Sequence, residues 1–130
     1  MAPPTLPDPS TEAGRAGLET LLAEPGRALL GLDFDGVLAP IVADPAQARA
    51  HPHVPPLLAA LADLGVQVAV ITGRPAEVAV EYGRLAGVPG IVVLGHYGAE
   101  RWSGGEVPAP GPAPGVEVVR RRLPDLLIEL

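Results

Sequence analysis

Residues 28–40 have the sequence ALLGLDFDGVLAP, in which an apolar run ends in Asp33 and Asp35 and is followed at once by Gly36. An uninterrupted apolar run between turn signals is typical of a strand buried on both faces, as in the middle of a parallel sheet. Ligands of open α/β sheets bind at the carboxyl ends of such strands. Asp33 and Asp35 are therefore candidate functional residues, and Gly36 lets the chain turn away sharply.

The same stretch has two other interpretations. A calcium loop needs acidic or amide side chains at its first, third and fifth positions and a glutamate at its twelfth. With Asp33 and Asp35 at the third and fifth positions, Gly31 and Val42 fall at the first and twelfth, so both end ligands are missing. The other interpretation is a polar turn after a strand, because aspartate is common in turns. The polar-turn interpretation stays open when this stretch is considered alone, and the rest of the chain makes it less favoured.

Length and composition indicate one modest domain. Of the 130 residues, 48% are hydrophobic and only 3% aromatic, so the core must be built from alanine, valine and leucine. The 16 glycines and 17 prolines approach the level of low-complexity chains. Because the prolines cluster at the N-terminus and in the later loops, much of the chain can still be ordered.

Charge and cysteine content argue against several functional classes. The net charge is −6 and the one basic run is residues 120–122, which argues against a nucleic-acid partner. There is no cysteine, which excludes disulfides and thiolate metal sites. We find no signal-peptide pattern and no apolar run long enough to span a membrane, and expect a soluble cytoplasmic protein that does not bind membranes. All nine basic residues are arginines.

The remaining pattern predicts alternating helices and strands. We expect a proline-rich tail over residues 1–10, then a helix over 11–24, capped by Ser10 or Thr11, whose leucines pack on the sheet. The further expected elements are a flap over 37–54, a helix over 55–64, a strand over 66–71, a helix over 75–85, a strand over 90–94, a Gly/Pro-rich linker over 103–115 and a helix over 116–130 that restarts at Pro124. This alternation is typical of right-handed βαβ units and a parallel sheet.

A second candidate site follows the second strand, where Thr72, Gly73 and Arg74 stand before a helix. Backbone N–H groups at such a turn suit an anion, especially beside a hydroxyl. An ordinary helix cap also explains Thr72. His51 and His53 in the flap suggest a metal site, but a proline separates them and no carboxylate pair is near, so we expect exposed loop residues.

Asp33-x-Asp35-Gly36 and Thr72-Gly73-Arg74 resemble the first two motifs of the haloacid-dehalogenase (HAD)-like phosphatases. The finer resemblance is to trehalose-6-phosphate phosphatases and rests on residues 33–41, 70–74 and 95–100. It extends over about residues 18–102 and implies a Rossmann-like, three-layer α/β fold with a parallel sheet. The domains that it implies are a tail over 1–10, the N-terminal part of the phosphatase core over 11–102, and a linker with the start of the cap region over 103–130. The C-terminal half and most of the cap domain would be missing.

The resemblance also implies a role for each candidate residue. Asp33 would be the nucleophile that forms an aspartyl-phosphate, and Asp35 would protonate the departing sugar oxygen and then activate water. The predicted substrate-binding residues are Thr72, Gly73, Arg74 and Gly36, with the Thr72 hydroxyl and the Gly73 N–H on phosphoryl oxygens. A Mg²⁺ cofactor would bridge the Asp33 carboxylate, the Asp35 carbonyl and the phosphate.

The sequence departs from the family pattern in three respects. Val37 stands where threonine is commoner, and Tyr97 stands where the third segment, Asn-His-Gly-x-Glu, has histidine. The family's phosphate-binding lysine has no counterpart, because the chain has no lysine. The second acidic metal motif is also missing, because the acids after Glu106 are Glu117, Asp125 and Glu129.

These features predict a phosphomonoester hydrolase by descent, converting trehalose 6-phosphate to trehalose, as in trehalose biosynthesis. We expect this chain itself to be an N-terminal part with little or no activity and poor stability. The first alternative is a phosphatase acting on another sugar phosphate. The second is a non-catalytic remnant that binds a phosphorylated ligand or a partner protein. We also expect self-association through an open sheet edge, because in the superfamily the first strand's next neighbour comes from the C-terminal half.

Overall fold

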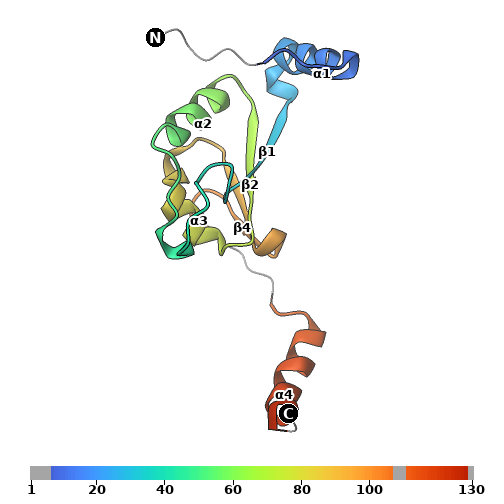
Figure 1. The fold of residues 1–130 in the computed structure, drawn as a ribbon, viewed down its shortest axis with the longest axis vertical. Helices are drawn as coiled ribbons and strands as arrows, with labels where there is room; N and C mark the ends of the chain where they lie inside the picture. The colour runs from blue at the N-terminus through green and yellow to red at the C-terminus, as the bar shows by residue number, and fades with distance from the viewer. Residues whose placement is uncertain (1–6, 107–110, 129–130) are drawn as a thin grey trace.

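The structure is a computed structural model that describes residues 7–106 and 111–128. In this part of the chain a four-stranded sheet is joined by helices (Figure 1). The α-helices are α1 (Glu12–Ala23), α2 (Val54–Asp63), α3 (Ala76–Gly83) and α4 (Pro114–Ile128). The strands are β1 (Leu29–Asp33), β2 (Gln67–Ile71), β3 (Val92–Gly95) and β4 (Glu100–Trp102). Short 3-10 helices are η1 (Pro25–Arg27), η2 (Pro45–Gln47), η3 (Leu85–Gly87) and η4 (His96–Gly98).

The strands lie in the order β1-β2-β3-β4. The first three are parallel, and β4 pairs antiparallel with β3. Asp33 is opposite Ile71, and Ile71 is opposite Leu94, so the carboxyl ends of the three parallel strands are level. The predicted α/β class with a parallel sheet is confirmed, and its register brings the two sequence motifs to one edge of the sheet.

Helices α2 and α3 cover one face of the sheet (Figure 1) and build the core with it. Val68 and Val70 of β2 point into this core, and Phe34, Leu85 and Val93 are fully buried beside them. Alternation along β2 places the intervening residues on the other face. Each fully buried aliphatic or phenyl side chain contributes about 1.5–3 kcal/mol, so a small core of valine, leucine and alanine holds the site in place.

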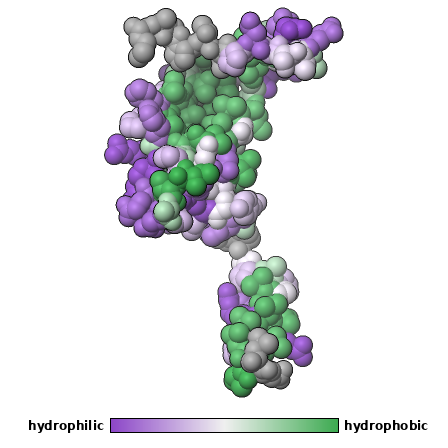
Figure 2. All heavy atoms as spheres, viewed as in Figure 1, coloured by the Kyte–Doolittle hydropathy of each residue, from purple (hydrophilic) through white to green (hydrophobic). Residues whose placement is uncertain are grey.

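The prediction that β1 is buried on both faces is wrong. β1 lies at the edge of the sheet, and its residues alternate between exposed and half-buried. Leu30 and Leu32 pack against the core, whereas Leu29, 68% exposed, lies with Ile71 on the open face. Figure 2 shows apolar surface over these strands. An apolar run has the same sequence whether or not a second layer covers it, so the pattern could not distinguish the two cases.

The helix α1 begins as predicted, because the Thr11 hydroxyl accepts a hydrogen bond of 3.0 Å from the Gly14 N–H. Its leucines do not pack on the sheet as we expected: α1 buries no residue, and Leu22 is 69% exposed. The amphipathic spacing was correct, but the helix lies at the N-terminal end of β1 (Figure 1) and buries no side chain against the sheet.

The helix α4 also differs from the prediction, since it runs through Pro124 without restarting. Proline removes one backbone donor, and the helix continues around that loss. No helix within residues 7–106 and 111–128 is long and apolar enough to cross a membrane. Parts of the predicted tail and linker, and the last two residues of the predicted final helix, lie outside the described residues.

The strand β4 was not predicted, and it connects the sheet to α3. Its Glu100 carboxylate accepts a 2.8 Å hydrogen bond from the Ala76 N–H in the first turn of α3. A carboxylate at a helix N-terminus satisfies a free donor and interacts favourably with the helix dipole. The turn before α3 is thereby fixed by a side chain from β4.

Candidate functional site

An open depression of about 530 Å³ lies at the carboxyl ends of β1 and β2. It is lined by Asp33, Asp35, Ile41, Val42, Pro45, Thr72, Gly73, Arg74 and Tyr97. Five of the six predicted site residues are therefore brought together here. Gly36 is the exception and lies outside this lining.

The aspartates are positioned by the tight turn after β1. Asp33 is exposed, and its Oδ1 accepts a 2.7 Å hydrogen bond from the Phe34 N–H. The fully buried Phe34 ring anchors the backbone between the two acids. Gly36 has φ of +86° and donates its N–H to the Ala39 carbonyl at 2.7 Å. That donor is engaged within the turn, so Gly36 shapes the loop and offers no N–H to a ligand.

Thr72 is 1% exposed and fixes the turn that follows β2. Its hydroxyl oxygen accepts a 3.1 Å hydrogen bond from the Arg74 N–H. The helix-cap interpretation is wrong for Thr72, because the residue before α3 is Pro75 and the carboxylate that binds the first turn is that of Glu100. Thr72 therefore holds a compact turn whose Gly73 faces the depression.

Arg74 binds Asp35 in a two-point ion pair across the depression. Its Nε donates to Asp35 Oδ2 and its Nη2 to Asp35 Oδ1, both at 2.7 Å. A third donor, Nη1, reaches the Pro45 carbonyl at 2.9 Å. The guanidinium also lies 5.4 Å from the centre of the Phe34 ring. Paired donors of this kind match the geometry of a carboxylate or a phosphate.

The ion pair sets the protonation of the site. The hydrogen bond from Arg74 and its charge hold the pKa of Asp35 below the ordinary aspartate value, against the opposing effect of partial burial. The same pair raises the pKa of Arg74. At neutral pH Asp35 is therefore an ionised carboxylate, able to accept a proton but without one to donate.

Tyr97 forms one wall of the depression, and we did not foresee its position. Its backbone N–H donates to the Thr72 carbonyl at 2.9 Å, and its side chain is laid against Gly73. Its place in the segment after β3 is the sequence signal for this position, but a tyrosine there departs from the histidine of the family pattern. Ile41, Val42 and Pro45 of the flap were missed because only the fold brings the flap over the strand ends.

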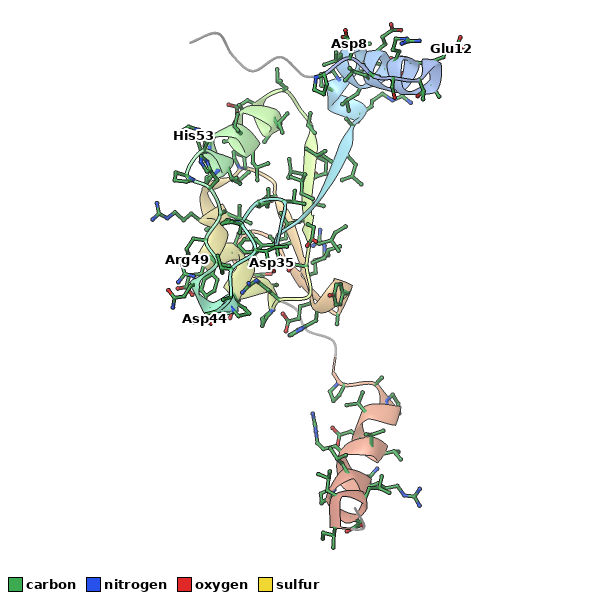
Figure 3. The ribbon with its side chains drawn as sticks, viewed as in Figure 1. Asp8, Glu12, Asp35, Asp44, Arg49 and His53 are labelled. Carbon is green, nitrogen blue, oxygen red and sulfur yellow. The ribbon has the colours of Figure 1, made fainter. Side chains whose placement is uncertain are left out.

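His51 and His53 are exposed, as predicted, in the segment before α2, and Figure 3 shows His53 far from Asp35. Their rings contact each other edge to face at 4.9 Å.

The predicted Mg²⁺ ligands make an incomplete site. Residues 7–106 and 111–128 contain no group of three or more acidic or histidine side chains that could hold a metal ion. Both carboxylate oxygens of Asp35 are engaged by Arg74, which leaves the Asp33 carboxylate and backbone oxygens as donors. Mg²⁺ demands near-octahedral oxygen coordination, completed by water or substrate phosphate. The described residues therefore do not by themselves fit this ion.

No family model matches the sequence, and no curated protein matches it either. Several solved structures do. A trehalose-6-phosphate phosphatase related protein gives a TM-score of 0.56 at 24% identity over 75% of this chain and 44% of that chain. The C-terminal domain of C. albicans trehalose-6-phosphate phosphatase gives 0.58 at 23% identity over 79% of this chain and 38% of that chain. A HAD subclass IIB sugar phosphatase gives 0.50 at 23% identity over 74% and 36%.

The chain thus has the fold of these phosphatases, and the resemblance expected from the motifs is confirmed at the level of the fold. It spans less than half the length of each of these proteins.

Proposed function

We propose that this chain, which has the fold of the HAD superfamily phosphatases, binds sugar phosphates in the depression and is a phosphomonoester hydrolase by descent. One observation carries the proposal. Two carboxylates after β1 and an anion-binding turn after β2 line the same depression. Parallel pairing of the two strands, with Asp33 opposite Ile71, creates this arrangement.

The turn after β2 is suited to the phosphate. Thr72 and Gly73 line the depression, and we expect the Thr72 hydroxyl and the Gly73 N–H to donate to phosphoryl oxygens, on which charge builds up in the transition state. Arg74 is the single cation among the lining residues described above. Its paired donors suit phosphate as well as the carboxylate they now bind.

The chemical step that we propose uses Asp33 as nucleophile. A carboxylate oxygen of Asp33 forms a bond to phosphorus as the bond from phosphorus to the sugar oxygen breaks, and water then hydrolyses the aspartyl-phosphate. The leaving oxygen must gain one proton in the first step, and the water must lose one in the second. We assign both proton transfers to Asp35. It must be protonated before the first transfer, and its ion pair with Arg74 disfavours the protonated form.

We propose that Arg74 inhibits the site in the free protein, because it keeps Asp35 ionised. A phosphate dianion can compete with Asp35 for the guanidinium, and once Arg74 has moved to the phosphate the pKa of Asp35 can rise. Arg74 then binds the phosphate in place of the family's lysine. Its planar guanidinium must therefore neutralise the phosphate charge that a compact lysine ammonium would otherwise neutralise. We expect binding with slow or absent turnover.

Trehalose 6-phosphate is the substrate that we propose first, supported by the motif resemblance and by two of the structural neighbours. Another sugar phosphate is the second candidate, supported by the sugar phosphatase of similar fold. The Arg74–Asp35 pair specifically favours a third possibility, a protein that binds a phosphorylated ligand without turnover. Any Mg²⁺ that assisted turnover would need ligands beyond the Asp33 carboxylate and the backbone oxygens, because both carboxylate oxygens of Asp35 are bound by Arg74.

The test is a panel of sugar phosphates, with trehalose 6-phosphate first, measured both for binding by calorimetry and for phosphate release with Mg²⁺. Asp33→Asn is the matched variant, since asparagine keeps the shape but is a poor nucleophile. Turnover that disappears in this variant supports the hydrolase, and binding without turnover supports the ligand-binding alternative. Absence of any binding by the wild-type chain would contradict both.

A further inference from the structure

Three successive residues of η4 have positive φ: His96 at 47°, Tyr97 at 55° and Gly98 at 100°. Left-handed backbone is unfavourable for residues with a Cβ, and two such residues in succession are rare. Hydrogen bonds from the His96 N–H to the Arg74 carbonyl and from the Tyr97 N–H to the Thr72 carbonyl, both 2.9 Å, hold the turn in place. The strained segment is thus attached directly to the anion-binding turn.

Packing does not offset this strain at Tyr97. The side chain is 85% exposed, so it gains little from burial. Its conformation instead determines where the aromatic side chain lies. A Cβ added at Gly73 would lie 2.7 Å from the Tyr97 hydroxyl oxygen, so the phenol end lies against Gly73, which belongs to the turn proposed to bind phosphate. Strained residues that persist without a packing benefit are concentrated at ligand sites.

The flap contributes apolar residues to the depression. Ile41, 82% exposed, and Val42 line the same depression from the flap. The same depression is lined by the polar side chains of Asp33, Thr72 and Arg74. An organic group attached to a phosphate bound by these residues would meet the tyrosine ring and the flap residues, because they line the same depression. A sugar ring has apolar C–H faces and hydroxyl edges, which suits an aromatic face with a phenol at its end.

We propose that Tyr97 is a specificity-determining residue that binds the sugar of a sugar phosphate, by contact of its ring with a C–H face of the sugar. This inference rests on the proposed phosphate-binding function of the depression. It gives a physical reason for the left-handed turn, which places an exposed aromatic ring in the lining of the depression.

The experiment compares the affinities for glucose 6-phosphate and inorganic phosphate by calorimetry, in the wild-type chain and in Tyr97→Gly. Glycine removes the ring and suits the left-handed backbone. We expect the preference for glucose 6-phosphate over inorganic phosphate to fall by about tenfold, and the melting temperature to be unchanged or higher. A lower melting temperature together with an unchanged preference would assign Tyr97 a structural role only.

Two further variants sharpen the result. His96→Gly relieves the same kind of backbone strain at a residue outside the lining of the depression, and it should keep the sugar preference. Tyr97→Phe keeps the ring and should lose no more than about threefold of the preference. Complete loss in the phenylalanine variant would overturn the assignment to the ring.

The inference and the proposed function fail in different ways. If the wild-type chain binds neither phosphate nor glucose 6-phosphate, the proposed function fails and the inference with it. If the wild-type chain binds both equally, or if Tyr97→Gly keeps the full preference, phosphate binding stands and the role of Tyr97 is overturned.

Discussion

Arg74 and Asp35 are the most tightly coupled residues of the site, and their ion pair has a consequence for stability. The pKa of Asp35 is lowered in the folded chain, chiefly by the hydrogen bond from Arg74. A carboxylate with a lowered pKa stabilises the folded state at pH values above its unfolded pKa of about 4. This contribution disappears as the pH falls through the folded value.

We therefore predict that Arg74→Gln destabilises the chain at neutral pH and that the difference from wild type disappears in strong acid. The decrease in the free energy of unfolding at neutral pH should not exceed about 1 kcal/mol, because 39% of the Asp35 side chain is exposed and solvent screens the ion pair. Urea unfolding across this pH range measures the difference. A constant difference at all pH values would show that Arg74 stabilises the fold by packing alone.

Thr72 offers a second test at the residue scale. Thr72→Val keeps the shape and the β-branch of this buried side chain but removes the hydroxyl. If the chain turns over a sugar phosphate, losing this transition-state hydrogen bond should reduce the rate by on the order of 10² to 10³. The change in melting temperature should be small by comparison. A rate within about threefold of wild type would show that the Thr72 hydroxyl acts only as the acceptor for the Arg74 N–H and not in catalysis.

Among the elements, β1 is the one that we expect to pair with a second copy of the chain. It pairs only with β2 among the described strands, and Leu29 of β1 and Ile71 of β2 lie on the open face of the sheet. Unpaired edge strands with apolar side chains are templates for pairing with another chain, and lysine on an edge opposes this.

Leu29→Lys should therefore reduce self-association of the 130-residue chain. Size-exclusion chromatography with light scattering, over a range of concentrations, measures the effect. Leu22→Lys is a control, since Leu22 is equally exposed but lies on α1 away from the sheet. A wild-type chain that stays monomeric at every concentration would contradict the proposal that the edge associates.

The pattern of apolar runs was sufficient to predict β1, β2, β3, α2 and α3, because each is bounded by glycine or proline. The motif resemblance grouped Asp33 with Thr72, and the parallel pairing of β1 with β2 brings both residues to the depression. The three-residue β4 was too short to produce a periodic signal. Tyr97 could not be assigned, because its left-handed backbone depends on hydrogen bonds to Thr72 that are formed only in the fold.

At the scale of the whole molecule, we predict that this 130-residue chain turns over trehalose 6-phosphate far more slowly than an ordinary enzyme. The site holds two carboxylates, one arginine and an incomplete set of metal ligands. Phosphate release with Mg²⁺, measured on a monodisperse fraction, is the appropriate assay. A rate near about 10 s⁻¹, typical of enzymes, would contradict this prediction.

The helix α4 stands apart from the sheet (Figure 1), and none of its described side chains is buried. A helix of 15 residues that contains a proline is marginal in water without tertiary support. Its backbone amides should consequently exchange with deuterium far faster than those of β2 and α3, whose hydrogen bonds open only with the core. On heating, circular dichroism should show a gradual loss of helical signal from α4 before the cooperative transition of the sheet and its two covering helices.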